Sequence, residues 1–263
     1  MKISVVIITL NEERIIERTL KAIHSWVDEI IVVDSGSTDR TLEIAQQYKC
    51  KTMYRKFDGD GPQKYFGVNQ TVNDWVFVLD ADEEVTPELR DEIEKTLSNP
   101  NDYNGFYVPI SLIFLGRLMR YGAEYKMPHL RLFNKKFGNF NDKFVHGGAV
   151  VEGQLATFNN HVLHYSYKDL HDYLQRLNYY TTRTAQMMYD SGKKGSILQV
   201  LFRFPVTFLK EYFLRKNFLN GYQGFVWSIL SAMYPVIKYA KLRELRLPSK
   251  ALLNENKHSY HHA

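Results

Sequence analysis

The stretch ISVVIITLNEERIIERTLKAIHSWVDEIIVVD (residues 3–34) decides the fold. It contains two β-branched apolar runs, residues 3–9 and 29–34, of the kind typical of parallel strands that are covered on both faces. Between them lies a helical pattern for which Asn11 is the predicted N-cap, with an apolar stripe at Ile15, Ile16, Leu20 and Ile23. The stretch therefore predicts a strand, a helix and a second strand of an α/β sheet.

The same alternation continues up to residue 100. Strands are predicted at residues 52–54 and 75–79, with a helix before each, the second of them over residues 63–72 after a break caused by Gly59, Gly61 and Pro62. Thr86 as N-cap and Pro87 at the first helical position predict a further helix. Strands that alternate with helices predict a doubly wound α/β sheet.

Beyond Pro100 the pattern changes. Residues 105–110 and 129–133 are predicted as strands of a mixed or antiparallel extension, and helical segments rich in basic and aromatic residues follow Asp169. The formal net charge is +5, yet the residues from Lys168 onward carry 15 Lys and Arg against 6 Asp and Glu. An acidic front part and a basic back part indicate two different roles.

The basic part suggests contact with a membrane. Between Ile197 and Tyr239, apolar side chains alternate with cationic ones, and such a stretch can lie in an anionic membrane interface. The alternative is a set of helices packed over the α/β domain. No apolar stretch reaches the roughly 20 residues needed to span a bilayer, so a peripheral contact is expected. No nucleic-acid-binding motif accompanies the charge, and no nucleic-acid partner is expected.

The single cysteine, Cys50, rules out an internal disulfide and favours a reducing compartment. The first apolar run is short, is followed by acidic residues and lacks a small-residue cleavage site, so it predicts a strand and not a signal peptide. The expected location is therefore cytoplasmic.

Polar residues cluster where the predicted strands end, which is where open parallel sheets bind ligands. Asp80 and Asp82 follow the apolar run at 75–79 and predict a site for Mg²⁺ or Mn²⁺, because hard oxygen ligands hold these ions together with substrate phosphates. The alternative is a solvated acidic helix entry that includes Glu83 and Glu84. Asp34 can accept hydrogen bonds from a ribose or a base, or can cap the strand end.

Several nucleotide-binding classes are not indicated. No G-x-G-x-x-G follows the first strand and no P-loop lysine motif is present. The histidines lack a recognisable ligand spacing, so zinc is not expected.

The motifs TLNEE (9–13), VVDSGSTD (32–39), LDADEE (79–84), RLF (131–133) and FVHGG (144–148) together resemble glycosyltransferase family 2, and within it the bacterial lipopolysaccharide-core β-1,4-glucosyltransferases. The resemblance implies a GT-A fold with a doubly wound mixed sheet. Residues 1–165 would form the catalytic domain, with a Rossmann-like nucleotide-sugar-binding half at 1–100 and an acceptor-side half at 101–165. Residues 166–263 would form a helical, basic, membrane-associated region.

The resemblance also assigns residues to a UDP-sugar donor. Those that would line the nucleoside pocket are Thr9, Asn11 and Glu12. Asp34 would bind the uracil or ribose side, and Asp39 would support that loop. Lys64 would approach the phosphates, with a solvated helix lysine as the alternative.

A metal and a catalytic base complete the implied site. Asp80 would contact the ribose or metal-bound groups, Asp82 would ligate Mg²⁺ or Mn²⁺, and Arg131 would grip phosphate, with a buried ion pair as its alternative. His146 would bind metal or phosphate, or would be a hydrogen-bonded structural histidine.

Family members of this type invert the configuration at the anomeric carbon and use one carboxylate as the base. Asp142 is the candidate here. Many relatives carry an acidic residue directly after the Val-His pair, where this chain has Gly147, so Glu152 and Asp102 remain rivals.

The predicted reaction is transfer of a hexose, glucose from UDP-glucose, to a heptose of the lipopolysaccharide inner core on the inner face of the bacterial inner membrane. One alternative is a family 2 enzyme that acts on a polyprenyl-linked or capsular saccharide. Two alternatives from other classes are a nucleotidyltransferase and a non-catalytic nucleotide-sugar-binding module.

Overall fold

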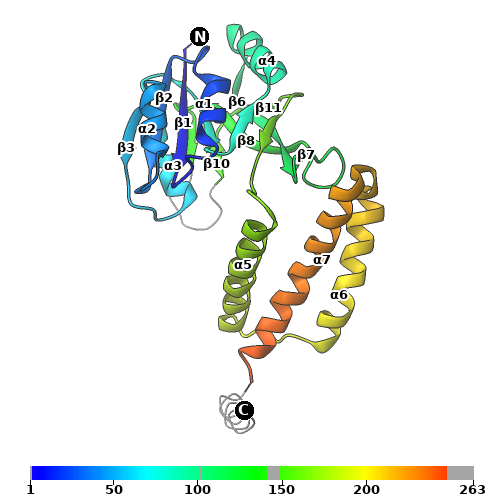
Figure 1. Cartoon of the computed structure of the whole chain (residues 1–263). Coiled ribbons are helices and arrows are strands. Elements are labelled where there is room, and N and C mark those ends of the chain that lie inside the picture. The colour runs from blue at the N-terminus through cyan, green and yellow to red at the C-terminus, as the bar shows by residue number, and fades with distance from the viewer. Residues whose placement is uncertain (1, 101, 141–147, 248–263) are drawn as a thin grey trace. The chain divides into compact units, whose positions relative to one another are not determined.

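The computed structural model describes residues 2–100, 102–140 and 148–247. The chain divides into two units, Met1–Ser166 and Tyr167–Ala263, and each is described by itself. Figure 1 shows strands and helices mixed in the first unit and helices alone in the second.

The first half of the first unit is a parallel sheet. Its strands lie in the order β3-β2-β1-β4 and are β1 (Ile3–Thr9), β2 (Glu29–Asp34), β3 (Lys51–Tyr54) and β4 (Trp75–Asp80). The connecting helices are α1 (Ile16–Ile23), α2 (Thr41–Gln47) and α3 (Asp60–Asn69), and α4 (Pro87–Ser98) follows β4. This arrangement confirms the predicted doubly wound α/β class.

The second half makes the sheet mixed. β8 (Met127–Asn134) runs antiparallel to β4, and β6 (Tyr103–Phe114) runs antiparallel to β8. The main path then ends with β12 (Val162–His164) and β5 (Glu83–Val85), while β7 (Arg117–Leu118) and β11 (Gln154–Thr157) also pair with β6. β9 (Gly138–Phe140) and β10 (Ala149–Val151) form a separate antiparallel pair.

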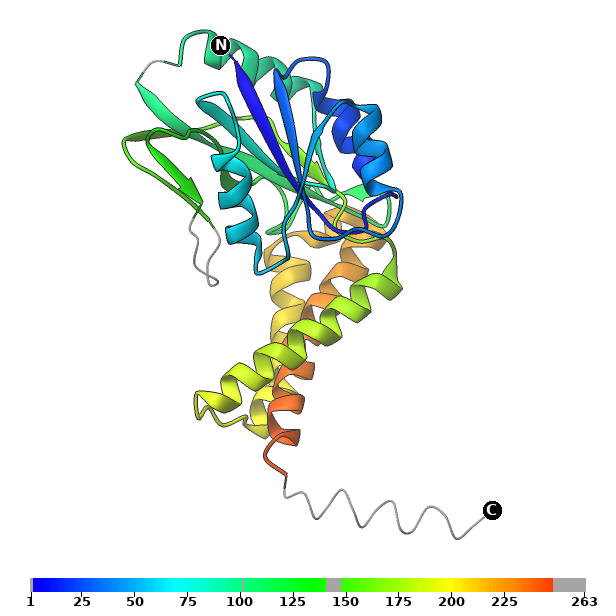
Figure 2. The ribbon, with the colours of Figure 1, turned by 90° about the vertical axis from the view of Figure 1, so that its left-hand side faces the viewer.

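Alternate residues of the strands serve the two faces of the sheet. Val5 and Ile7 of β1 belong to the larger apolar core with Leu20 of α1, whereas Val6 packs with Val68 of α3 in a smaller core on the other face. Figure 2 shows α3 on one side of the sheet and α1 and α2 on the other. Because successive side chains of β1 point to opposite faces, both faces of the sheet are apolar, and helices cover both of them.

Two helix starts differ from the prediction. Asn11 does not cap α1, since it has a φ of 55° and lies in the loop before a helix that begins at Ile16. Asparagine tolerates this left-handed conformation better than most residues. α3 begins at Asp60 and ends at Asn69, so Gly61 and Pro62 lie inside its first turn, where a proline needs no hydrogen-bonded N–H. The predicted cap at Thr86 is confirmed, because its Oγ1 accepts a hydrogen bond from the Leu89 N–H.

The second unit consists of helices and confirms the predicted helical C-terminal part. Its elements are α5 (Leu170–Asp190), α6 (Ile197–Leu209), the π-helical turn η1 (Lys210–Leu214), the 3₁₀ turn η2 (Asn217–Asn220) and α7 (Gly221–Glu244). Aromatic rings of Tyr173 on α5 and Trp227 on α7 meet edge to face at 5.8 Å. No helix in the described part of this chain has both the length and the apolar character to cross a membrane.

Gly67 lets α3 pack closely on the sheet, and this contact is testable. A Cβ at position 67 would lie 2.4 Å from Val6 Cγ1 and 3.0 Å from Val33 Cγ2, both in fully buried side chains. We expect Gly67→Ala to lower the free energy of unfolding by about 1–2 kcal/mol, because overpacking outweighs the gain of about 1 kcal/mol in helix propensity.

Urea unfolding is best followed by tryptophan fluorescence in a Trp227→Phe background, where only Trp26 and Trp75 of the first unit report. Gly148→Ala is the control, since its added Cβ would meet no atom within 4 Å. An unchanged urea midpoint for Gly67→Ala would show that α3 can shift away from the sheet at no cost.

Candidate functional site

Two loops at the carboxyl ends of β1 and β2 are held together by reciprocal hydrogen bonds. The Asn11 N–H donates to Ser37 Oγ at 2.9 Å, and the Thr38 N–H donates back to Asn11 Oδ1 at 2.8 Å. The Asn11 side chain therefore connects the loops from its left-handed position. Thr9, at the end of β1, has a buried hydroxyl without a hydrogen-bond partner among the described residues.

Asp39 extends this connection. Its carboxylate accepts hydrogen bonds from the Glu13 N–H at 3.0 Å and from the backbone and hydroxyl of Thr41, and these bonds lower the pKa of Asp39 although burial opposes them. Thr41 Oγ1 also accepts a hydrogen bond from the Glu12 N–H at 2.8 Å. The predicted nucleoside-pocket residues thus share one ordered pair of loops.

Asp34 occupies the position of a strand-end cap. Its side chain is buried, and its carboxylate accepts hydrogen bonds from the Gly36 and Ser37 N–H groups, each at 2.8 Å, and from the Ser37 hydroxyl. Gln63, which is fully buried on α3, donates to Ser35 Oγ and to the Arg55 carbonyl, each at 2.8 Å. Gln63 therefore links the loops after β2 and β3, a role that the sequence did not reveal.

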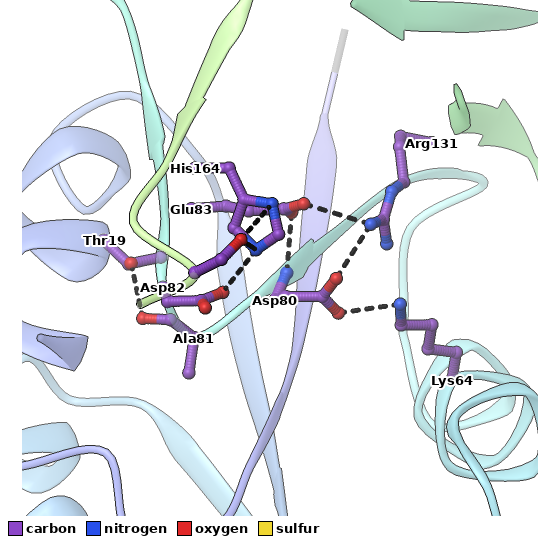
Figure 3. A network of polar contacts seen from close by, with 9 residues as sticks. Thr19, Lys64, Asp80, Ala81, Asp82, Glu83, Arg131 and His164 are labelled. Atoms are coloured by element: carbon purple, nitrogen blue, oxygen red, sulfur yellow. Dashed lines mark hydrogen bonds and ion pairs between the residues drawn. The ribbon is translucent and has the colours of Figure 1, made fainter. Parts of the chain in front are cut away.

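Asp80 lies at the centre of a charge network (Figure 3). Lys64 Nζ of α3 lies 2.7 Å from Asp80 Oδ1, and Arg131 Nη2 of β8 lies 2.8 Å from Asp80 Oδ2. The same guanidinium nitrogen lies 3.0 Å from Glu83 Oε1, while Glu83 Oε2 accepts a hydrogen bond from the Asp80 N–H at 2.8 Å. Lys64, Glu83 and Arg131 are all buried, whereas the Asp80 side chain is 26% exposed, so the network reaches the surface at Asp80.

Burial and charge set the protonation states in this network. Burial alone would raise the pKa of Asp80, but the charges of Arg131 and Lys64 hold that pKa well below its usual range. Burial raises the pKa of Glu83 above its ordinary value. Burial and the same two cations lower the pKa of His129.

These contacts settle several alternatives from the sequence. Lys64 is a buried partner of Asp80 and not a solvated helix lysine. Arg131 forms the buried ion pair, yet its second terminal nitrogen, Nη1, is buried without a hydrogen-bond partner among the described residues. Glu83 belongs to β5 and is 1% exposed, so the acidic run is not a solvated helix entry.

Asp82 lies next to a histidine from the far end of the first unit. His164 Nε2, in β12, lies 3.2 Å from Asp82 Oδ1, and the Tyr165 N–H donates to the Asp82 carbonyl at 2.9 Å. Burial lowers the pKa of His164, but its hydrogen bond to Asp82 and the nearby carboxylates raise the pKa above the ordinary value. Thr19 Oγ1 of α1 fixes the intervening residue by donating to the Ala81 carbonyl at 2.7 Å.

His164 is a site residue that the sequence did not identify. It is 82 positions away from Asp82 and has no recognisable ligand spacing. Its one signal is its position at the end of a short apolar strand, which the pairing of β12 with β5 brings beside the acidic cluster. The described residues contain no group of three or more His, Cys, Asp or Glu side chains that could hold a metal by themselves.

A cleft of about 680 Å³ opens beside the charge network. Its lining includes the start of α3 and the outer part of β8, with Asp60, Lys64, His129 and Arg131 as the charged or titratable groups. Tyr107 of β6 and Phe140 of β9 add aromatic surface. The cleft combines cationic and aromatic groups, which suits a ligand with a charged part and a ring.

The predicted base and its rivals lie in different places. Asp142 and His146 lie outside the described residues. Asn104 Nδ2 donates to the Glu152 carbonyl at 2.8 Å, and Asp102 lies two positions before Asn104. The pairings of Gly105 with Phe133 and of Trp75 with Asn134 place these two carboxylates near the start of β4, whereas Asp80 ends it.

Removal of Arg131 tests the network. We expect Arg131→Met to lower the free energy of unfolding by about 3–5 kcal/mol, because Glu83 would remain buried without its cationic partner. Lys64→Met should cost less, since Asp80 keeps Arg131. Adding Glu83→Gln to Arg131→Met should recover part of the loss by removing the uncompensated charge. Urea unfolding of the four proteins checks this, and a loss equal for both single variants would contradict it.

Comparisons with known proteins fit this architecture. The model of the family described as "Glycosyl transferase family 2" matches residues 4–152. A glycosyltransferase of Rickettsia typhi is 34% identical over 263 residues, which cover 96% of this chain and 90% of that protein. The lipopolysaccharide core biosynthesis glycosyltransferase LpsC of Rhizobium meliloti is 28% identical over 249 residues, with 92% of each chain covered.

Two solved structures show partial likeness. TarS (residues 1–349) of S. aureus has a TM-score of 0.46 at 15% identity and covers 94% of this chain and 91% of that one. Glucosyl-3-phosphoglycerate synthase of Mycobacterium tuberculosis, in complex with Mn²⁺, UDP and glucosyl-3-phosphoglycerate, has a TM-score of 0.37 at 27% identity and covers 41% and 44%.

The family model matches more than half of the chain, and the Rickettsia protein is similar over nearly the full length of both chains. The mixed sheet and the acidic motif that follows β4 agree with these two matches. On these grounds the chain, with its mixed sheet, belongs to glycosyltransferase family 2.

Proposed function

We propose that this glycosyltransferase uses a divalent metal to transfer glucose from UDP-glucose, with inversion, to a heptose of the lipopolysaccharide inner core. The observation that carries the proposal is the meeting of Asp82 and His164 at the carboxyl end of β4, beside the interlocked loops after β1 and β2. The similarity to LpsC supports a lipopolysaccharide-core acceptor.

The Asp82–His164 pair fits a divalent cation. Two ligands on adjacent corners of an octahedral Mg²⁺ or Mn²⁺, each about 2.1 Å from the ion, lie about 3 Å apart. The observed separation of Nε2 and Oδ1 is 3.2 Å. One carboxylate and one imidazole leave several positions for diphosphate oxygens, and a carboxylate with substrate phosphates is the usual ligand set of Mg²⁺ in nucleotide sites. We therefore assign His164, together with Asp82, as the metal-binding pair, and His146 remains a prediction.

The donor would lie across the strand ends. The backbone of Asn11 and Glu12 and the hydroxyl of Thr9 border the nucleoside side, while Asp34 and Asp39 hold the loops in shape. Lys64 and Arg131 keep Asp80 ionised, and Asp80 is then able to accept hydrogen bonds from the ribose.

The chemistry needs a base on the side of the sugar opposite the diphosphate. A bound divalent cation would stabilise the charge that develops on the departing diphosphate. Asp142 is the proposed base, which would take the proton of the acceptor hydroxyl as that oxygen attacks the anomeric carbon. No covalent glycosyl-enzyme intermediate is needed in this single displacement.

The proposed acceptor indicates where in the cell the enzyme works. A lipid-linked saccharide is presented at a membrane surface, so we place the enzyme at the inner face of the bacterial inner membrane as a peripheral protein. The basic composition of the chain after Lys168 supports this placement. A second candidate acceptor is a polyprenyl-linked or capsular saccharide, which the same site geometry would accommodate.

Substitution at the metal pair tests the metal-dependent step. We expect Asp82→Asn and His164→Ala each to lower UDP release from UDP-glucose by about a hundredfold or more, because the metal supplies several kcal/mol and about 1.4 kcal/mol is a factor of ten. EDTA should abolish release by the unaltered enzyme, and added Mg²⁺ or Mn²⁺ should restore it.

Calorimetric titration of Mn²⁺ in the presence of UDP provides a readout apart from turnover, and both variants should bind Mn²⁺ more weakly. Asp74→Asn is the matched control, because Asp74 is an exposed carboxylate that pairs with Lys136 before the start of β4. Full activity in EDTA would overturn the metal assignment.

The base assignment is tested by three carboxamide variants. Asp142→Asn should lose transfer to a heptose-terminated lipopolysaccharide acceptor by about 10²–10⁴-fold while it keeps UDP-glucose binding. Asp102→Asn and Glu152→Gln should keep near-normal transfer, because the sheet register places them near the start of β4.

Transfer rates are measured with a panel of UDP, GDP and dTDP sugars. A loss confined to Glu152→Gln would move the base to that residue. Turnover with only another donor or acceptor would remove the glucose-to-heptose assignment and keep the family.

A further inference from the structure

α6 presents apolar side chains to solvent along its whole length. None of its 13 residues is buried. The apolar side chains that are between 52% and 63% exposed are Ile197, Leu198, Leu201, Phe202, Val206 and Leu209. The following π-helical turn continues this surface with Phe213 and Leu214, which are 54% and 79% exposed. We call these eight side chains the α6–η1 surface.

Such a surface requires an apolar environment. A helix that is apolar over most of its circumference is normally buried in a core or in a membrane. Within the second unit α6 lies beside α7, as both views of the ribbon show, and stacked rings of Phe204 and Phe208 continue to Tyr212. Among the described residues of this unit, 167–247, no element covers the outer face, so the α6–η1 surface is available for contact with a partner.

The charges around the surface identify the partner. Residues 191–243 contain nine Lys and Arg and a single acidic residue, Glu211. Glu211 is itself buried and pairs with Arg215 at 2.7 Å. The exposed cations next to the apolar side chains include Lys193 and Lys194 before α6, Arg203 within it, and Lys210 and Lys216 around η1.

A second copy of this chain fits this pattern poorly. A symmetric dimer would bring identical positive rims together, and like charges repel. A bilayer with anionic headgroups offers both an apolar interior for the side chains and negative charge for the rim. Complementary charge therefore favours a lipid surface over self-association.

The dimensions indicate how the surface would lie. Thirteen residues at 1.5 Å per residue give a helix of about 20 Å, shorter than the roughly 30 Å hydrocarbon core. A helix of this length with a cationic rim lies in the plane of the interface and inserts its apolar side chains below the headgroups.

We propose that the α6–η1 surface is a monotopic membrane-binding element that inserts into the interface of an anionic bilayer. It would bring the enzyme to a lipid-linked acceptor, and in that respect it rests on the proposed function. Lipid binding itself requires neither donor nor acceptor and is measured without turnover.

Vesicle flotation of the full chain tests the proposal. The unaltered protein should float with vesicles of phosphatidylethanolamine and phosphatidylglycerol and should float poorly with phosphatidylcholine alone. The double variant Leu201→Glu with Phe202→Glu should lower partitioning by about tenfold or more, because it removes two inserted side chains and adds charge at an anionic interface. Its positions are exposed, so the fold should persist, as circular dichroism can verify.

Matched controls separate apolar from charge effects. Val72→Asp changes an apolar side chain that is 74% exposed in the first unit and should not alter flotation. Lys210→Glu with Lys216→Glu should weaken binding to the anionic vesicles, with a loss that diminishes at high salt.

Flotation of the Leu201→Glu, Phe202→Glu protein equal to that of the unaltered chain would overturn the proposal. So would an unaltered chain that ignores vesicles but forms a dimer that this double variant dissociates, since a second copy would then cover the surface.

UDP release with a soluble, deacylated acceptor distinguishes the two proposals. The double variant should retain this activity. Vesicle binding without turnover on any acceptor would uphold the membrane element and reject the proposed reaction. Turnover without vesicle binding would uphold the proposed reaction and reject the membrane element.

Discussion

The ion pairs of the partly buried Asp80 carboxylate with Lys64 and Arg131 are the interaction on which the first unit depends. Lys64 and Arg131 are buried cations, and a buried charge without a partner is costly, so the carboxylate of Asp80 stabilises both of them. These partners come from α3 and β8, and Glu83 of β5 shares the same guanidinium. The network thus fixes the parallel half of the sheet, its antiparallel extension and the turn that carries Asp82 relative to one another. Asp82, which the proposed metal site uses, lies between two members of this network in the sequence, Asp80 and Glu83.

The parallel half of the fold was predictable because β1, β2 and β4 are apolar runs of six or seven mostly buried residues. β3, with four residues and none buried, was predicted as part of the strand–helix alternation. The runs at residues 3–9 and 29–34 are separated by a segment with helical apolar spacing, and this pattern indicates two strands joined by a helix. The short strands β5, β9, β10, β11 and β12 were not predicted, because they lie outside the strand–helix alternation and three or four residues carry no period that distinguishes a strand from a loop. Asn11 was misplaced as a helix cap for a related reason, since asparagine suits both a cap and a left-handed loop position.

Part of the candidate site was equally accessible from sequence. Parallel strands end at one edge, so Thr9, Asp34 and Asp80 were expected to gather there, and they do. Sequence could not show that the Asp34 carboxylate accepts hydrogen bonds from the turn that follows it, because hydrogen-bond partners depend on loop conformation. Nor could it pair Asp82 with His164, since that contact depends on β12 crossing back beside β5. Local pattern predicts where polar groups emerge, whereas tertiary pairing decides which of them meet.

The close seating of α3 on β1 has a consequence for how this sequence can change over time. Lys64 and Gly67 are three positions apart and therefore lie on one face of the helix, toward the sheet. Gly67 admits almost no larger side chain, because Val6 lies directly against it. Any substitution that lifts the helix would also withdraw the ammonium group from Asp80. Substitutions on the inward face of α3 are thus limited both by the available volume and by the need for a charge. Tyr65 on the same helix is 39% exposed, and its position can accept more kinds of side chain.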